Sequence, residues 1–224
     1  MKPWVRLDTA KIPGGGGELR LMQRDSELSI MAGAVTLMNS RLSGSETALA
    51  ELACDRLLDR PNCRVLIGGY GMGFTLRAVL AGLGANAQVV VAELVPAVLE
   101  WARGPMAALT AGCLDDPRVH LVAGDVAAVI GAVVCGYDAI LLDVDNGPNG
   151  LTRAANSQLY SSRGLDLAKV ALKPGGILAV WSAKPDASFS RRLKDVGFKV
   201  EEISVRARGN GKGPRHVIWF GRLR

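Results

Sequence analysis

The sequence predicts an α/β protein whose mostly parallel sheet is covered by helices on both faces. From residue 64 onward, short runs of Val, Ile and Leu alternate with helix-compatible segments, the pattern of βαβ units. The first run leads into a glycine-rich turn at 68–73, and the last two runs follow one another directly, joined by glycines. The 224 residues, 49% of them hydrophobic, suffice for one such domain with a full core.

A small β region is expected before this domain. Residues 18–24 and 27–31 alternate between apolar and polar side chains, and Asp25-Ser26 forms a turn between them. We therefore divide the chain into a small N-terminal β region, 1–42, and an α/β domain, 43–224.

The α/β domain is expected to open with a helix. Ser43 and Glu46 have the spacing of a capping box, and apolar residues follow at helical intervals. After it we expect strands over residues 64–68, 88–93, 118–123, 137–143 and 176–181, and helices over residues 73–83, 95–110, 125–133, 157–171 and 187–196. Residues 199–206 and 215–222 predict a closing antiparallel hairpin.

The turn after the first parallel strand indicates a nucleotide-binding βαβ unit. Gly69, Gly71 and Gly73 let the backbone approach a ligand closely, and Glu93, at the end of the next strand, can accept hydrogen bonds from ribose hydroxyls. A dinucleotide fingerprint needs its third glycine at the position of Phe74, and the phosphate-binding lysine motif is absent. An adenosine-containing cofactor other than a dinucleotide is therefore expected.

Two more acids follow strands of the predicted sheet. Asp125 comes after the third parallel strand and is either a helix N-cap, a ligand contact or both. Asp143 comes after the fourth strand, at the edge where ligands bind in open α/β sheets. We expect Asp143 to have a functional role.

Composition limits the other classes of function. The four cysteines form no C-x-x-C pair and there are two histidines, so no metal site is expected. Apolar runs are shorter than a membrane span and the N-terminus lacks a secretory apolar region, so we expect a cytoplasmic protein. Residues 191–224 carry ten Lys or Arg against three acids, which suits either a solvated edge hairpin or contact with an anion such as nucleic acid.

A parallel sheet that ends in an antiparallel hairpin resembles the class I S-adenosylmethionine-dependent methyltransferase superfamily, over roughly residues 60–224. The resemblance implies a Rossmann-like methyltransferase fold with a seven-stranded sheet. It also implies that the glycine turn faces the methionine part of S-adenosylmethionine, that Glu93 binds the ribose and that Asp125 contacts adenine. The cofactor-binding residues implied are Gly69, Gly71, Met72, Gly73, Glu93, Leu94, Asp125, Val126 and Asp143.

Within that superfamily the chain is similar to the spermidine synthase group. Residues 66–77 resemble its glycine motif, 137–143 resemble Y-D-x-I-x-x-D, and 45–51 resemble D-E-x-x-Y-x-E. The N-terminal β region also fits this group. The resemblance implies a homodimer and a small-molecule acceptor.

The chain departs from that group at three positions. Met72 replaces the aspartate that holds the amino end of the cofactor, Asn146 replaces the second acid of D-S-S-D-P, and Leu49 replaces a tyrosine. A cationic polyamine needs anionic partners, since hydrogen bonds to charged groups contribute about 1.5–3 kcal/mol each. These departures favour methyl transfer from S-adenosylmethionine to an unidentified acceptor.

The expected reaction is in-line attack of a nucleophile on the activated carbon, which requires mainly positioning. Asp143 and Asp145 are expected to orient or deprotonate the nucleophile, and Asn146 to hydrogen-bond a substrate amine. The substrate pocket is expected to be closed by Asn39, Arg41 and Glu46.

Two alternatives remain beside methyl transfer. The first is aminopropyl transfer from decarboxylated S-adenosylmethionine to an amine. The second is a non-catalytic module that binds an adenosine ligand, or RNA through the basic C-terminal end.

Overall fold

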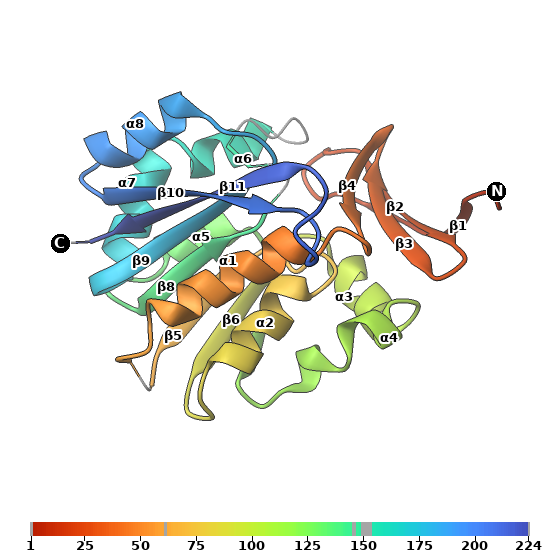
Figure 1. The fold of residues 1–224 in the computed structure, drawn as a ribbon, viewed down its shortest axis with the longest axis horizontal. Helices are drawn as coiled ribbons and strands as arrows, with labels where there is room; N and C mark the ends of the chain where they lie inside the picture. Colours follow the sequence, from red (N-terminus) through yellow and green to blue (C-terminus); the bar gives the residue numbers. More distant parts are fainter. Residues whose placement is uncertain (1, 61, 145–146, 149–153, 224) are drawn as a thin grey trace.

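The computed structural model describes the whole chain apart from residues 1, 61, 145–146, 149–153 and 224, and it contains two sheets (Figure 1). The strands are β1 (Val5–Lys11), β2 (Glu18–Arg24), β3 (Glu27–Ala32), β4 (Val35–Asn39), β5 (Arg64–Gly68), β6 (Gln88–Glu93), β7 (Val119–Ala123), β8 (Tyr137–Leu142), β9 (Leu172–Ser182), β10 (Lys199–Arg206) and β11 (Arg215–Arg222). The helices are α1 (Gly44–Asp55), α2 (Phe74–Gly82), α3 (Pro96–Arg103), α4 (Ala107–Thr110), α5 (Val126–Gly131), α6 (Ala154–Leu159), α7 (Ser162–Ala171) and α8 (Ala187–Asp195), with a 3₁₀ turn at Cys113–Asp115.

The larger sheet has seven strands in the order β10-β11-β9-β8-β5-β6-β7. The strands from β9 to β7 are parallel, and β11 and β10 add an antiparallel hairpin beyond β9. The strand order reverses between β5 and β8, and in open α/β sheets ligands bind outside the carboxyl ends of the strands at such a point. The α/β prediction, with its closing hairpin, is confirmed.

Helices cover both faces of this sheet (Figure 1). Side chains from α1, α2 and α3 form one core with the sheet, and side chains from α5, α7 and α8 form the other. The central strands are buried on both sides, which is why β5, β6 and β8 each contain an uninterrupted run of Val, Ile, Leu or Ala.

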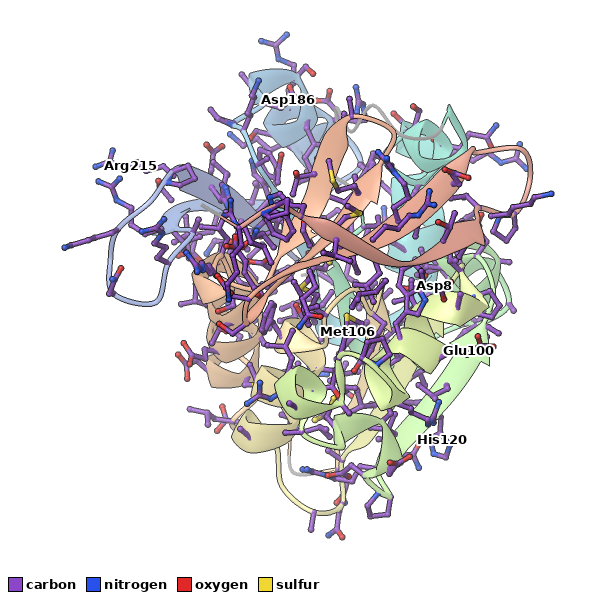
Figure 2. All side chains as sticks on the ribbon, turned by 90° about the vertical axis from the view of Figure 1, so that its right-hand side faces the viewer. Asp8, Glu100, Met106, His120, Asp186 and Arg215 are labelled. Atoms are coloured by element: carbon purple, nitrogen blue, oxygen red, sulfur yellow. The ribbon has the colours of Figure 1, made fainter. Side chains whose placement is uncertain are left out.

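The N-terminal region forms its own four-stranded antiparallel sheet, in the order β1-β2-β3-β4. It contains the two strands expected from alternation, and β1 and β4 in addition. The indole Nε1 of Trp101 in α3 donates to Asp8 Oδ2 at 2.6 Å, which ties β1 to the α/β part of the chain (Figure 2).

Two helix predictions are corrected. The helix expected over 95–110 ends at Arg103, because Pro105 has no backbone N–H to continue the ladder, and a short helix, α4, follows. The helix expected over 157–171 divides into α6 and α7, where the Ser161 side chain accepts from Gly164 N and caps the second helix.

The capping box predicted at the start of α1 is wrong. Ser43 is the N-cap residue, but its side chain makes no cap hydrogen bond. The carboxyl group of Glu46 instead accepts from the hydroxyl group of Ser45. Glu46 therefore faces inward, toward the sheet, rather than back along its own helix.

Among the described residues, no helix is long and apolar enough to cross a membrane. That same part of the chain contains no cluster of three or more His, Cys, Asp or Glu side chains placed to hold a metal ion. Cys54, Cys63 and Cys113 are buried free thiols, whereas Cys135 is exposed.

Candidate functional site

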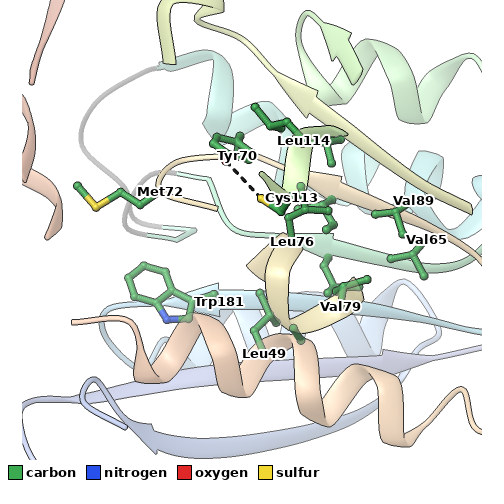
Figure 3. Packing of buried hydrophobic residues seen from close by; sticks show 14 of the residues in the cluster. Leu49, Val65, Tyr70, Met72, Leu76, Val79, Val89, Cys113, Leu114 and Trp181 are labelled. Carbon is green, nitrogen blue, oxygen red and sulfur yellow. Dashed lines mark hydrogen bonds between the residues drawn. The ribbon is translucent and has the colours of Figure 1, made fainter. Parts of the chain in front are cut away.

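In the glycine-rich loop after β5, successive residues alternate between the cleft and the core. Gly69 and Gly71, with φ of +86° and +55°, line a cleft, and Tyr70 and Met72 are packed into the core. Figure 3 shows both side chains within the buried cluster, with the Tyr70 hydroxyl 3.5 Å from Cys113 Sγ. A Cβ atom at Gly69 would lie 2.5 Å from the backbone oxygen of Asp143, so only glycine fits there.

Two of the glycine-loop residues expected at the cofactor do not line this cleft. Met72 is only 1% exposed, with its side chain in the apolar core. Gly73 is the N-cap of α2, with φ of +77°, and an added Cβ atom there would lie 2.7 Å from the Tyr70 hydroxyl oxygen. Their contribution is to shape the loop around Gly69 and Gly71.

The cleft lies between the N-terminal sheet and the carboxyl ends of the central strands. It encloses about 840 Å³, including its open mouth. Its lining comprises Ile12, Leu19, Ile30, Leu37 and Met38 from the N-terminal region, and Gly69, Gly71, Ala92, Glu93, Leu94, Val95, Val98, Gly124, Asp125, Val126, Asp143 and Val144 from the α/β part. Most of these side chains are apolar and a few are acidic, as is typical of small-molecule pockets.

Glu93 is held rigidly at one side of the cleft. Its Oε2 accepts from Tyr70 N and its Oε1 from Val95 N, both at 2.9 Å. Burial raises the pKa of this carboxyl group, and the backbone N–H donors around it act in the opposite direction. A carboxylate offers about four lone-pair sites, so acceptor capacity remains for hydroxyl groups of a ligand.

Asp125 acts as the N-cap of α5 and also lines the cleft. Its Oδ1 accepts from Ala127 N at 2.8 Å. Leu94 and Val126, the residues that follow Glu93 and Asp125, lie in the same wall. Of the two interpretations left open from the sequence, the N-cap is confirmed, and the position in the cleft is compatible with ligand contact as well.

Asp143 is the buried acid at the floor of the cleft. It is 5% exposed; its Oδ2 accepts from Thr75 Oγ1 at 2.7 Å, and its Oδ1 has no hydrogen-bond partner within the described residues. Burial raises the pKa of Asp143, and the Thr75 hydroxyl moderates this rise. An unsatisfied buried oxygen is costly, so the site suits a ligand that donates a hydrogen bond or carries positive charge here.

Glu46 is a second buried acid beside Asp143. It is 8% exposed and accepts from Ser45 Oγ at 2.6 Å. Burial raises the pKa of Glu46, and the neighbouring charge of Asp143 raises it further. The two carboxyl groups therefore resist ionising together.

Glu46, Asn39 and Arg41 were expected at the substrate pocket, but none of them lines the cleft. Asn39 Nδ2 donates to Glu27 Oε1 at 2.7 Å, and Arg41 Nε lies 3.2 Å from Glu27 Oε2. Both side chains thus satisfy a buried acid of the N-terminal sheet rather than line the cleft. Asp145 and Asn146 lie outside the described residues.

The apolar wall from the N-terminal region was not anticipated. Leu19 and Ile30 belong to the alternating strands β2 and β3, whose apolar side chains are indistinguishable from core residues in the sequence. Leu37 and Met38 lie on β4. Thr75, in the first turn of α2, carries no sequence signal for a contact with Asp143.

Comparisons with known proteins identify relatives whose names refer to polyamines. The sequence profile described as "Spermine/spermidine synthase domain" matches residues 53–191. A "Polyamine aminopropyltransferase" of Mycobacterium tuberculosis (strain CDC 1551 / Oshkosh) is 33% identical over 156 residues, which cover 68% of this chain. The match spans only 28% of that relative's length.

Two further proteins are similar to this chain, one in fold and one in sequence. The crystal structure of spermidine synthase from Thermotoga maritima superposes with a TM-score of 0.76, covering 97% of this chain and 72% of that chain at 18% identity, which shows the fold. "Putrescine N-methyltransferase 4" of Nicotiana tabacum is 34% identical over 116 residues, covering 51% of this chain and 28% of that protein.

Proposed function

The chain belongs to the spermine/spermidine synthase family, and from that premise we propose that it transfers an aminopropyl group from decarboxylated S-adenosylmethionine to an amine. The observation that carries the proposal is the buried Asp143, which lines the cleft beside the glycine loop and whose Oδ1 has no hydrogen-bond partner among the described residues. The aminopropyltransferase relative adds support. Aminopropyl transfer thus takes precedence over the methyl transfer favoured by the sequence departures.

In this proposal the cleft holds the nucleoside of the donor. Glu93 accepts from the ribose hydroxyls, Asp125 contacts the adenine, and the apolar side chains of the N-terminal sheet cover the rings. The sulfonium group of the donor supplies an activated carbon, and Asp143 removes a proton from the acceptor ammonium so that the nitrogen can attack. The carbon–sulfur bond breaks with its electron pair on sulfur, giving methylthioadenosine.

Methyl transfer to an amine is the second candidate. Two observations favour it: the similarity to a putrescine N-methyltransferase, and the burial of Met72 in the core at the position where the family carries an acid for the donor's amino end. Both reactions need an amine nucleophile and a base at Asp143, and they differ in which carbon on sulfur is attacked.

The products distinguish the two reactions. The protein is incubated with an amine panel and either decarboxylated or carboxylated S-adenosylmethionine, and the nucleoside products are separated by chromatography. Aminopropyl transfer yields methylthioadenosine with the decarboxylated donor, whereas release of S-adenosylhomocysteine would establish methyl transfer instead. Asp143→Asn should lower kcat by about 10²–10⁴-fold, the range of a positioned base. Asp166→Asn, an exposed aspartate on α7, is the matched control.

Three expectations from the sequence stay predictions. These are the homodimer, the cytoplasmic location and the division of the chain at residues 42 and 43. Light scattering from the purified protein measures the mass in solution and tests the first of them.

A further inference from the structure

A chain of hydrogen-bonded side chains leads from Glu46 away from the cleft. Ser45 Oγ donates to Glu46 Oε2 at 2.6 Å and lies 2.8 Å from His216 Nδ1 on β11. Ser45 is fully buried, and His216 is half-buried, with its ring edge against the Trp181 ring at 4.9 Å. This row of hydrogen bonds therefore connects the buried Glu46 to His216, which is nearer the surface.

The Ser45 hydroxyl can serve Glu46 in either protonation state. When Glu46 is a carboxylate, Ser45 donates to it and accepts from His216 Nδ1–H. When Glu46 is a carboxylic acid, it donates to Ser45, and Ser45 donates to an unprotonated Nδ1. A proton can thus pass between Glu46 and His216 while every hydrogen bond of the chain is kept.

The charge of Asp143 governs which state Glu46 adopts. Burial and the Asp143 charge both raise the pKa of Glu46, so neutralising Asp143 lowers that pKa. Thr75 on α2 faces the pair with a neutral hydroxyl, and burial lowers the pKa of His216. Among the described residues around Glu46, the exposed Arg208 belongs to the hairpin segment whose backbone packs on the start of α1.

We propose that Ser45 and His216 form a proton exit for Glu46, through which the buried acid pair keeps a single negative charge when Asp143 takes a proton from the acceptor amine. This inference rests on the proposed function for its amine. Glu46, Ser45 and His216 are positioning residues in it, since they act on the reacting amine only through the charge of Asp143.

The protons balance at each step. Asp143 gains the proton of the acceptor ammonium, which leaves a neutral amine with a free electron pair. Glu46 then gives its proton to Ser45 as Ser45 gives its own to His216 Nδ1. His216 releases its Nε2 proton to water and becomes the Nδ1–H tautomer. One negative charge, now on Glu46, remains beside the ammonium that forms as the new carbon–nitrogen bond is made.

Nitrogen NMR of the histidines tests the exit without using activity. The chain has two histidines, and His120 on β7 is exposed and far from the hairpin that carries Arg215 and His216, so it serves as the internal control (Figure 2). As the pH rises through the titration of Glu46, we expect the proton of neutral His216 to move from Nε2 to Nδ1. Asp143→Asn should shift this change to lower pH, and Ser45→Ala should abolish it. A His216 tautomer that is independent of pH, or unaffected by both variants, would overturn the proposal.

Kinetics with imidazole buffers test the role of the exit in turnover. His216→Ala should lower kcat roughly tenfold, a modest acid–base effect, with unchanged affinity for methylthioadenosine. Added imidazoles should restore the rate according to their basicity, and they should fail to restore Ser45→Ala. His120→Ala should match the unaltered protein. Equal rates for His216→Ala and the unaltered protein would overturn the proton exit. If the unaltered protein transfers nothing to any amine while the pH-dependent tautomer change of His216 is still observed, the proposed function is overturned instead.

Discussion

Glu93 and Asp143 illustrate two ways in which a buried acid prepares a site. Glu93 accepts hydrogen bonds from backbone N–H groups that fix its orientation, which suits the ribose-binding role we propose for it. Asp143 has one oxygen without a hydrogen-bond partner among the described residues, and in the proposed reaction this carboxyl group takes the proton. Both residues line one cleft, and in our proposal Glu93 binds the ligand whereas Asp143 takes part in the reaction.

The substitution Glu93→Gln tests the binding role. It replaces one acceptor oxygen with a donor facing backbone N–H groups, so the affinity for methylthioadenosine should fall by about 10–100-fold, equivalent to about 1.5–3 kcal/mol for a charged hydrogen bond. Isothermal titration calorimetry measures this, with the exposed Glu100→Gln on α3 as the control. Equal affinities for the two variants would remove Glu93 from the site.

Glu46 should make the stability of the protein depend on pH. Its pKa is raised from 4.5 to about 8 by burial and by Asp143, so the folded state favours the protonated form. The stabilisation is complete below pH 4.5 and is lost as the pH rises toward about 8. In Glu46→Gln, the free energy of unfolding in urea should therefore decline less between pH 5 and pH 9. Parallel declines in both proteins would contradict a raised pKa for Glu46.

At the scale of elements, the α/β part could be predicted well because its signals are local. Runs of Val, Ile and Leu mark β5, β6 and β8, and the hairpin strands β10 and β11 occur at the residues expected. The glycine turn could be identified because a backbone with positive φ favours glycine, and all three glycines of this turn have positive φ.

The predictions were less complete where contacts between distant elements determine which partners a side chain has. No local sequence signal near Ser45 and Glu46 indicates a contact with His216, which is 171 residues from Ser45. Glu46 is therefore expected from the sequence at a helix cap and at the substrate pocket, and the buried hydrogen bonds are not predicted. The substrate roles expected for Asn39 and Arg41 rest on sequence position, and the structure pairs both with Glu27. Sequence reasoning reached the acids at strand ends and missed the partners that other elements bring to them.

The turn after β5 requires glycine at residue 69 for a steric reason that does not apply at residue 17. Gly69 and Gly17 have similar φ values, +86° and +84°, but a Cβ atom meets the Asp143 backbone only at Gly69 and open space at Gly17. Gly17→Ala should cost about 1 kcal/mol of unfolding free energy from the backbone alone. Gly69→Ala should cost about 1–3 kcal/mol more from the clash, and it should also weaken nucleoside binding. An equal loss of unfolding free energy in both variants, measured in urea, would show that the backbone at Asp143 shifts to relieve the clash.

At the scale of the whole molecule, the cleft exists because two sheets meet. The α/β part supplies the acids and the glycine loop, and the N-terminal sheet supplies an apolar wall. Met38 on β4 lies directly over Gly71, where an added Cβ atom would collide with its sulfur. Ligand affinity should therefore depend on side chains of a sheet that carries none of the acids lining the cleft.

The substitution Met38→Ala tests whether the N-terminal sheet contributes to ligand affinity. Loss of the apolar wall over the glycine loop should weaken methylthioadenosine binding by roughly 5–30-fold, equivalent to about 1–2 kcal/mol of buried apolar surface. Met31→Ala on β3 is the matched control, since Met31 is also half-buried but does not line the cleft. Equal binding by both variants would argue that the N-terminal sheet leaves the ligand uncovered.

Under the proposed function, the cleft should prefer the decarboxylated donor. The buried pair of Glu46 and Asp143 disfavours a further carboxylate nearby, because like charges in a desolvated site repel. Isothermal titration calorimetry with both forms of S-adenosylmethionine measures this preference directly. We predict that the decarboxylated form binds at least about tenfold more tightly, a difference of about 1.4 kcal/mol. Tighter binding of the carboxylated form would contradict aminopropyl transfer and restore methyl transfer as the function.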